Sequence, residues 1–192
     1  MRKLMLYMHV SLDGFVQGEQ DWDINWITYN EELEQYADET FSTVDTVLWG
    51  RGTYLGMQQY WTNVPDDASA HDKAHSIWIN KTQKVVISTT LETADWNNSI
   101  LIKDNIAEEV RKLKNGDGRD MVIIGSPRLA HSLMRHNLID EFRVNVNPVV
   151  LGKGLPLFKD IEERIPLELV ENRTFRCGVA GLIYRLKSEP QS

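Results

Sequence analysis

The sequence has few of the features that mark secreted, membrane-spanning or disulfide-rich proteins. Cys177 is the only cysteine among 192 residues, which excludes an intrachain disulfide and fits a reducing compartment, so we expect a cytoplasmic protein. No apolar run approaches the length of a membrane span, so no membrane partner is expected. The apolar run from Leu4 to Val10 is short and no small-residue cleavage site follows it. This favours a strand over a signal peptide.

Positive charge is also scarce. Lysine and arginine together number 21 against 28 acidic residues, a formal net charge of -7. Such a chain has no excess of cations to displace counterions from a phosphate backbone, so we expect no nucleic-acid partner. No internal repeat, linker or low-complexity tract interrupts the chain. We therefore expect one domain over residues 1–187, followed by a polar tail at 188–192.

Hydrophobic periodicity predicts strands that alternate with helices. The expected strands cover 3–10, 44–49, 84–88, 99–102, 121–125 and 140–147, and the expected helices cover 29–42, 105–114 and a segment starting at Pro127. Two last strands, 165–173 and 179–187, are expected to form a hairpin. Region 54–80 is rich in Trp, Tyr, Gln and Asp and predicts short helical pieces and loop. The order indicates an α/β fold with an antiparallel edge.

Polar residues predict where the helices begin. Thr28 with Glu31 matches a capping box, and Asn105 with Glu108 has the same spacing. Ser126 precedes a proline and is the expected N-cap of the following helix.

Two strand-to-helix turns have the composition of phosphate-binding sites. In the first, Gly50 and Gly52 allow close backbone approach, Arg51 adds a planar cation, and Thr53 adds a hydroxyl. The second, Gly125–Pro127, has a similar character. Free amides at a helix start together with arginine bind phosphate well, whereas a surface ion pair is the alternative role for Arg51. Two such turns predict a ligand with more than one phosphate, such as a dinucleotide.

The motifs also occur in a characteristic order. They are Ser11–Gly14, Gly50–Tyr54, Lys84–Ser88, Gly125–Pro127, Leu138–Phe142 and Asn147–Phe158. This set resembles the dihydrofolate reductase-like superfamily, and within it the branch of the RibD C-terminal domain, the reductase domain of riboflavin biosynthesis. The resemblance covers residues 3 to about 187. It implies an α/β fold with a mixed, mainly parallel sheet flanked by helices, a C-terminal antiparallel hairpin, a homodimer, and NADPH as hydride donor.

The resemblance also implies which residues bind the cofactor. Phosphate contacts would come from Gly50, Arg51, Gly52 and Thr53, contacts near the adenosine 2′-phosphate from Ser88 and Thr89, and the pyrophosphate turn from Gly125, Ser126, Arg128 and Leu129. The loop 152–158 would help to close the site.

Departures from the riboflavin enzymes bear on the substrate. Those enzymes place a lysine four residues before the serine of Ser-Leu-Asp-Gly, where this chain has Tyr7, and favour an acid where it has Ile124. We therefore expect an NADPH-dependent reductase of a small nitrogen heterocycle of pterin, folate or pyrimidine type. One alternative is 5-amino-6-(5-phosphoribosylamino)uracil reductase. The other is a nucleotide-binding protein without turnover.

Three residues are candidates for the substrate side. Asp13 follows the first strand and is the expected catalytic group, with a turn residue bonded to its own backbone as the alternative. Trp22 has a ring suited to stacking on a heterocycle or to packing. Dihydrofolate reductase carries an acid on its first helix, and we take Glu32 as its counterpart, although spacing does not choose among it, Glu31 and Glu34.

His71 and His75 lie four residues apart, as metal ligands on a helix do. No third ligand with convincing spacing accompanies them. We therefore expect no metal site.

Overall fold

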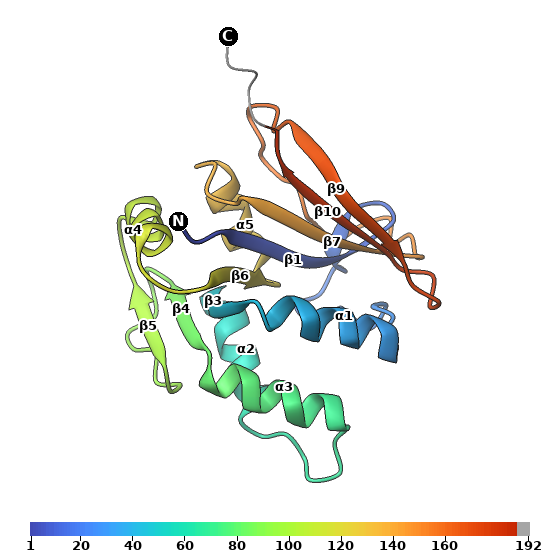
Figure 1. Cartoon of the computed structure of the whole chain (residues 1–192), viewed down its shortest axis with the longest axis horizontal. Helices are drawn as coiled ribbons and strands as arrows, with labels where there is room; N and C mark the ends of the chain where they lie inside the picture. Colours follow the sequence, from blue (N-terminus) through green and yellow to red (C-terminus); the bar gives the residue numbers. More distant parts are fainter. Residues whose placement is uncertain (188–192) are drawn as a thin grey trace.

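The structure, a computed structural model, describes residues 1–187 and contains an eight-stranded sheet with the order β5-β4-β3-β6-β1-β7-β10-β9 (Figure 1). The six strands from β5 to β7 in this order run parallel to one another. β10 runs antiparallel to β7, and β9 runs antiparallel to β10. Their bounds are β1 Leu4–Ser11, β3 Val44–Gly50, β4 Gln83–Ile87, β5 Ser99–Ile102, β6 Asp120–Ile124, β7 Glu141–Asn147, β9 Leu167–Thr174 and β10 Ala180–Leu186. The expected mixed sheet and hairpin are confirmed, and the expected polar tail lies outside the described residues.

A second, two-stranded sheet joins two segments that the sequence predicts as loops. β2 (Phe15–Gln17) pairs antiparallel with β8 (Leu155–Pro156). The backbone N–H of Leu157 donates to the carbonyl of Gly14 over 2.8 Å. This pairing fixes the loop after β7 against the turn after β1.

The helices cover both faces of the main sheet (Figure 1). α1 (Glu31–Phe41), α2 (Arg51–Trp61) and α3 (Ala70–Lys81) lie on one face, and α4 (Ile106–Asn115) and α5 (Pro127–Met134) on the other. The predicted helical pieces and loop over 54–80 are confirmed in outline, but the pieces are most of two regular helices, with a loop between them at residues 62–69. Each buries one hydrophobic residue, Tyr54 or Ile79, too few to give a clear helical period. None of the helices within residues 1–187 combines the length and apolarity needed to cross a bilayer.

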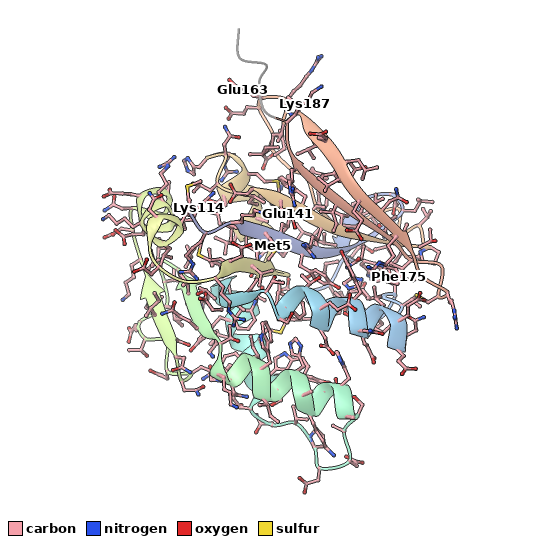
Figure 2. All side chains as sticks on the ribbon, viewed as in Figure 1. Met5, Lys114, Glu141, Glu163, Phe175 and Lys187 are labelled. Carbon is pink, nitrogen blue, oxygen red and sulfur yellow. The ribbon has the colours of Figure 1, made fainter. Side chains whose placement is uncertain are left out.

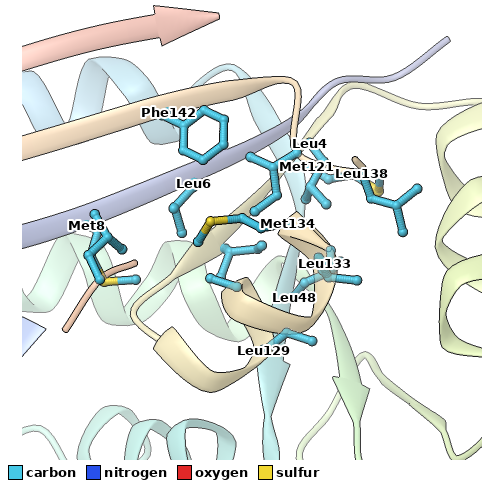
Figure 3. Close-up of a cluster of buried hydrophobic side chains, with 14 of the residues drawn as sticks. Leu4, Leu6, Met8, Leu48, Met121, Leu129, Leu133, Met134, Leu138 and Phe142 are labelled. Atoms are coloured by element: carbon cyan, nitrogen blue, oxygen red, sulfur yellow. The ribbon is translucent and has the colours of Figure 1, made fainter. Parts of the chain in front are cut away.

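The alternation along β1 separates two hydrophobic layers. Leu4, Leu6 and Met8 point toward α5 and pack in the cluster of Figure 3. Met5 and Tyr7 point the other way, and Figure 2 marks Met5 between β1 and α1. A polar side chain at an odd-numbered position of β1 therefore enters the layer beneath α1.

The predicted helix caps are wrong in their side-chain contacts. α1 is capped by Asn30, whose Oδ1 accepts the N–H of Leu33 at 3.0 Å, whereas Thr28 donates its N–H to Asn147. Asn105 and Ser126 occupy the N-cap positions of α4 and α5 but have φ of 48° and 53°. Neither side chain bonds its own helix start.

Candidate active site

The predicted cofactor residues lie at the carboxyl ends of the parallel strands. β3 ends at Gly50, β4 at Ile87 and β6 at Ile124, and the candidate turns follow directly. β3 pairs with β4 on one side and β6 on the other, so these three ends are adjacent. This edge is where ligands bind in open parallel sheets.

The turns after β3 and β6 are joined by a hydrogen bond. We call residues 50–53 the first glycine turn and residues 125–128 the second. The backbone N–H of Gly50 donates to the hydroxyl oxygen of Ser126 at 3.1 Å. Because α2 and α5 lie on opposite faces of the sheet, this bond brings two helix N-termini from opposite sides to one place at the sheet edge.

The charge at the N-termini of α2 and α5 differs from that at the other helix starts. α1, α3 and α4 each carry acidic residues in the first turn, whereas α2 and α5 carry none and have Arg51 and Arg128 there. Both arginines are exposed, and neither belongs to any ion pair formed within residues 1–187. A cation beside the positive end of a helix dipole is unfavourable for folding. An anionic ligand at this place would offset that cost.

The helix starts also leave backbone donors accessible. Neither α2 nor α5 has a side-chain cap, so the first amides of each helix have no side-chain partner. A Cβ added to Gly52 would meet no atom within 4 Å, so the space beside the first glycine turn is open. The residues present therefore fit a group with several phosphates. Leu129 differs from its neighbours, because its side chain is buried in the core, and a Cβ added to Gly50 would lie 3.9 Å from the Leu129 Cβ.

Ser88 and Thr89 follow β4 but differ in how accessible their hydroxyl groups are to a ligand. Ser88 is buried, and its hydroxyl oxygen accepts the N–H groups of Thr90 and Leu91 at 3.2 and 3.0 Å. Thr89 is exposed. Of the two, Thr89 presents the more accessible hydroxyl.

Asp13 holds a loop in place. Its Oδ1 accepts from the Ser11 hydroxyl at 2.7 Å and from Leu151 N–H at 3.1 Å, and its Oδ2 accepts from Gly152 N–H at 2.7 Å. These hydrogen bonds, with that of Ser11 the largest cause, lower the pKa of Asp13 below its ordinary value. An ionised carboxylate has no proton to give. Two of these contacts tie the turn after β1 to the loop after β7, and the catalytic role of Asp13 stays a prediction.

The two other substrate candidates contact different parts of the fold. Trp22 is 45% exposed and packs on α2 at Gly56, where an added Cβ would stand 2.2 Å from the Trp22 ring. Glu32 accepts the backbone N–H of Arg176 at 3.0 Å and so ties α1 to the turn between β9 and β10. Figure 2 shows Phe175 at this end of the hairpin.

A group of polar side chains that the sequence prediction missed lies beneath α1. His9 faces Asn145 across β1 and β7, and Ser11 faces Asn147. We call Tyr7, His9, Asn145 and Asn147 the polar cluster. All four are buried, and both asparagines have zero exposure.

Three buried atoms of the polar cluster make no hydrogen bond of normal geometry: the Tyr7 hydroxyl and both amide atoms of Asn145. The Asn145 side chain nevertheless lies close enough to the Tyr7 hydroxyl to oppose the rise in the pKa of Tyr7 that burial causes. Burying such an atom unpaired costs about 1–3 kcal/mol, so native structures rarely tolerate it without a function. Asn147, by contrast, donates to the Asn145 carbonyl at 3.0 Å and accepts from Thr28 N–H. These three atoms are closed to solvent, and their hydrogen-bonding capacity is not used by a bond of normal geometry.

The polar cluster is uncharged at neutral pH. Burial lowers the pKa of His9 to about 4 and raises the pKa of Tyr7, so the imidazole is neutral and the phenol keeps its proton. The ring of Tyr29, 58% exposed, lies 5.2 Å from the His9 ring and covers the cluster on the solvent side. A neutral hydrogen-bonding surface suits an uncharged heterocycle.

The sequence does contain a signal for this cluster. In β7, Arg143, Asn145 and Asn147 alternate with apolar residues. Tyr7 and His9 alternate with apolar neighbours in β1 in the same way. Polar residues with a period of two inside a buried strand indicate a functional layer or a polar core.

An apolar hollow lies on the other face of β7 and reaches the Ser11–Gly14 turn and the loop 152–158. Val144, Leu182 and Tyr184 line it together with Phe158. Side chains alternate along β7, so Val144 points away from Asn145 and the polar cluster. The lining offers few groups for orienting a heterocycle.

Comparison with known proteins gives consistent results. A family model described as the RibD C-terminal domain matches residues 2–180. The chain is 35% identical over 185 residues to the uncharacterized protein YyaP of Bacillus subtilis (strain 168), which covers 95% of this chain and 94% of that protein.

Two solved structures share the fold. One is a candidate riboflavin biosynthesis protein from Shewanella sp. PV-4, with a TM-score of 0.74, 19% identity, and coverage of 97% of this chain and 99% of that one. The other is dihydrofolate reductase from Enterococcus faecalis complexed with NADP(H), with a TM-score of 0.64, 12% identity, and coverage of 97% of each chain.

Proposed function

The chain belongs to the RibD C-terminal domain family, and from this premise we propose that it is an NADPH-dependent reductase of a small nitrogen heterocycle of pterin, folate or pyrimidine type. One observation carries the proposal. Two arginine-bearing helix N-termini meet through the Gly50–Ser126 hydrogen bond at the sheet edge where parallel sheets bind ligands. The polar cluster lies on β1 and β7, with β1 next to β6 in the same sheet.

The glycine turns would hold the cofactor phosphates. Amides of the first glycine turn and the guanidinium of Arg51 would bind one phosphate, and the second turn with Arg128 would bind the other. Thr89, exposed beyond β4, is better placed than Ser88 to contact a 2′-phosphate, because the Ser88 hydroxyl already accepts two backbone N–H groups. NADPH, when bound, supplies a hydride, and the protein supplies orientation.

The polar cluster would bind the substrate. The amide of Asn145 offers a donor and an acceptor side by side, which matches the N–H and C=O edge of a pterin or pyrimidine ring. Tyr7 keeps its proton and would donate a hydrogen bond to a ring nitrogen or carbonyl oxygen. Tyr29 covers the cluster, so its exposed side chain would move aside to admit the ring.

The same cluster argues against the phosphorylated riboflavin intermediate as substrate. Tyr7 and Ile124 replace a lysine and an acid that the resemblance implies for those enzymes. The nearest cation on β7, Arg143, is already bound to Glu141 at 2.7 Å and to the Thr40 hydroxyl at 2.9 Å. The polar cluster therefore offers neutral groups to its ligand.

The proposal is tested by following NADPH oxidation by the purified chain with dihydrofolate, a dihydropterin and the riboflavin-pathway pyrimidine in parallel. We expect turnover with one of the unphosphorylated heterocycles. Turnover confined to the pathway intermediate would replace our proposal with the riboflavin reductase. Tight NADPH binding without turnover on any acceptor would support a nucleotide-binding protein instead.

We further propose that the reductase works in the cytoplasm as a homodimer. The single cysteine supports a reducing compartment. The dimer follows from the family resemblance alone, and a monomer in light scattering at micromolar concentration would contradict it.

A further inference from the structure

Three potential metal ligands meet between α1 and α3. His71 and His75 lie one turn apart on α3, and Asp38 lies on α1. One ligand atom from each residue lies within 4.8 Å of the other two, and the Asp38 carboxylate is 3.4 Å from Nδ1 of His71. The sequence predicts no metal because no third ligand is near the histidines along the chain. Helix packing supplies that ligand from a distant segment.

We propose that Asp38, His71 and His75 form a binding site for a divalent transition-metal ion of the zinc class. Two imidazoles and one carboxylate are a ligand set that zinc uses when a fourth position is left to water. The imidazoles disfavour magnesium and calcium, and the lack of a thiolate disfavours copper(I). Tetrahedral zinc needs ligand atoms roughly 3.3 Å apart. Small rotations of the Asp38 and His71 side chains, which are 53% and 24% exposed, would close the gap.

His75 is fixed in place by aromatic packing. Its ring lies 4.4 Å from that of Trp61, 5.1 Å from that of Trp78 and 5.7 Å from that of Phe41. A ligand held by rigid neighbours loses little freedom when it binds an ion.

The other nearby acid belongs to the helix start. Asp72 accepts from the Ser69 hydroxyl at 2.9 Å, and its backbone N–H donates to Ser69 in return. This leaves the two histidines and Asp38 as the one group of three such ligands within residues 1–187. A bound ion would link α3 to α1, and α1 covers the polar cluster.

The test uses tag-free protein stripped with a chelator and titrated with zinc or cobalt(II) alone. Calorimetry gives the stoichiometry, and the visible absorption of cobalt(II) reports tetrahedral coordination. We expect one ion per chain and a higher melting temperature with zinc but not with magnesium.

Two variants and a control assign the ligands. H71Q and D38N change exposed or half-exposed side chains, so both should fold, whereas H75Q would also disturb the aromatic packing. H71Q and D38N should each weaken zinc binding by about a hundredfold or more, because losing even a residue that only supports a metal ligand costs roughly 10–100-fold. H136Q removes an exposed histidine away from the site and should bind zinc like the parent chain. Unchanged affinity in H71Q or D38N, or no saturable binding by the parent chain, would overturn the proposal.

Discussion

The backbone N–H of Gly50 donates to the hydroxyl oxygen of Ser126 at 3.1 Å, and this bond joins the two turns that carry the cofactor proposal. The residues are 76 positions apart in the chain. Ser126 has φ of 53° and makes no capping bond to its own helix. Its side chain therefore serves the neighbouring strand end, and the spacing of the two turns depends on it.

Replacing Ser126 with glycine should weaken NADPH binding while leaving the fold intact. Glycine adopts the positive φ without strain, so S126G removes the hydroxyl alone. One neutral hydrogen bond contributes about 0.5–1.5 kcal/mol, which predicts roughly a two- to tenfold rise in the NADPH dissociation constant. N137G changes another residue with positive φ, 51°, away from the site and should leave the constant unchanged. Equal weakening in both variants would mean that backbone freedom, not the hydroxyl, is responsible.

Replacing Arg51 with alanine should change stability and binding in opposite directions. Removing a cation from a helix N-terminus should leave the free energy of unfolding unchanged or raise it by about 0.3–1 kcal/mol. Losing a charge-assisted phosphate contact should weaken NADPH binding by about 1.5–3 kcal/mol, and R51K should restore only part. Denaturant unfolding and calorimetry measure the two effects. A destabilised R51A with parental affinity would make Arg51 structural.

Replacing Tyr7 with phenylalanine should lower activity without destabilising the protein. The Tyr7 hydroxyl makes no hydrogen bond of normal geometry, so its removal should keep or raise the free energy of unfolding and lower kcat/KM. Y54F is the matched control, because the Tyr54 hydroxyl accepts the backbone N–H of Trp96 at 2.8 Å. That variant leaves a buried donor unpaired and should cost about 1–3 kcal/mol. If Y7F destabilises as much as Y54F, the hydroxyl of Tyr7 serves the fold and not a ligand.

Asp13 should contribute to stability and not to proton transfer. The pKa of Asp13 is lowered in the folded chain, chiefly by the hydrogen bond from the Ser11 hydroxyl. The ionised carboxylate therefore stabilises the folded chain at pH values above its ordinary pKa of 3.8, and this stabilisation is lost as the pH falls through the pKa of the folded chain. D13N should remove this acid-side dependence and leave the pH profile of kcat above neutrality unchanged. A D13N variant that folds normally but loses its activity at all pH values would restore the catalytic assignment.

Local pattern predicted most of the sheet but not the segments whose structure depends on packing. The strands predicted at 3–10 and 121–125 correspond to β1 and β6, which are rich in apolar residues and lie next to each other inside the sheet. The bounds of α2 and α3 were not predicted, because each helix buries a single hydrophobic residue fully and its sequence shows no clear helical period. β2 and β8 are too short for any period, and they form only because they pair with each other.

The candidate site was also predicted only where local sequence pattern determines it. Glycine and arginine at a strand end identify the first glycine turn from sequence alone. The unpartnered state of Asn145 is visible only in three dimensions, because it depends on what α1 and the strands leave unbonded. Ser88 has the expected position, but its hydroxyl is used by the following turn, a local contact that the resemblance does not reveal.

The central claim is that the two glycine turns bind NADPH, and calorimetric titration of the parent chain with NADPH and with NADH tests it most directly. The account predicts one saturable site with NADPH bound more tightly by about 1.5–3 kcal/mol, or roughly ten- to a hundredfold, because of the added phosphate contact. The same titration of R51A should show weaker NADPH binding. Equal dissociation constants for the two cofactors, or no saturable binding of either, would contradict the account.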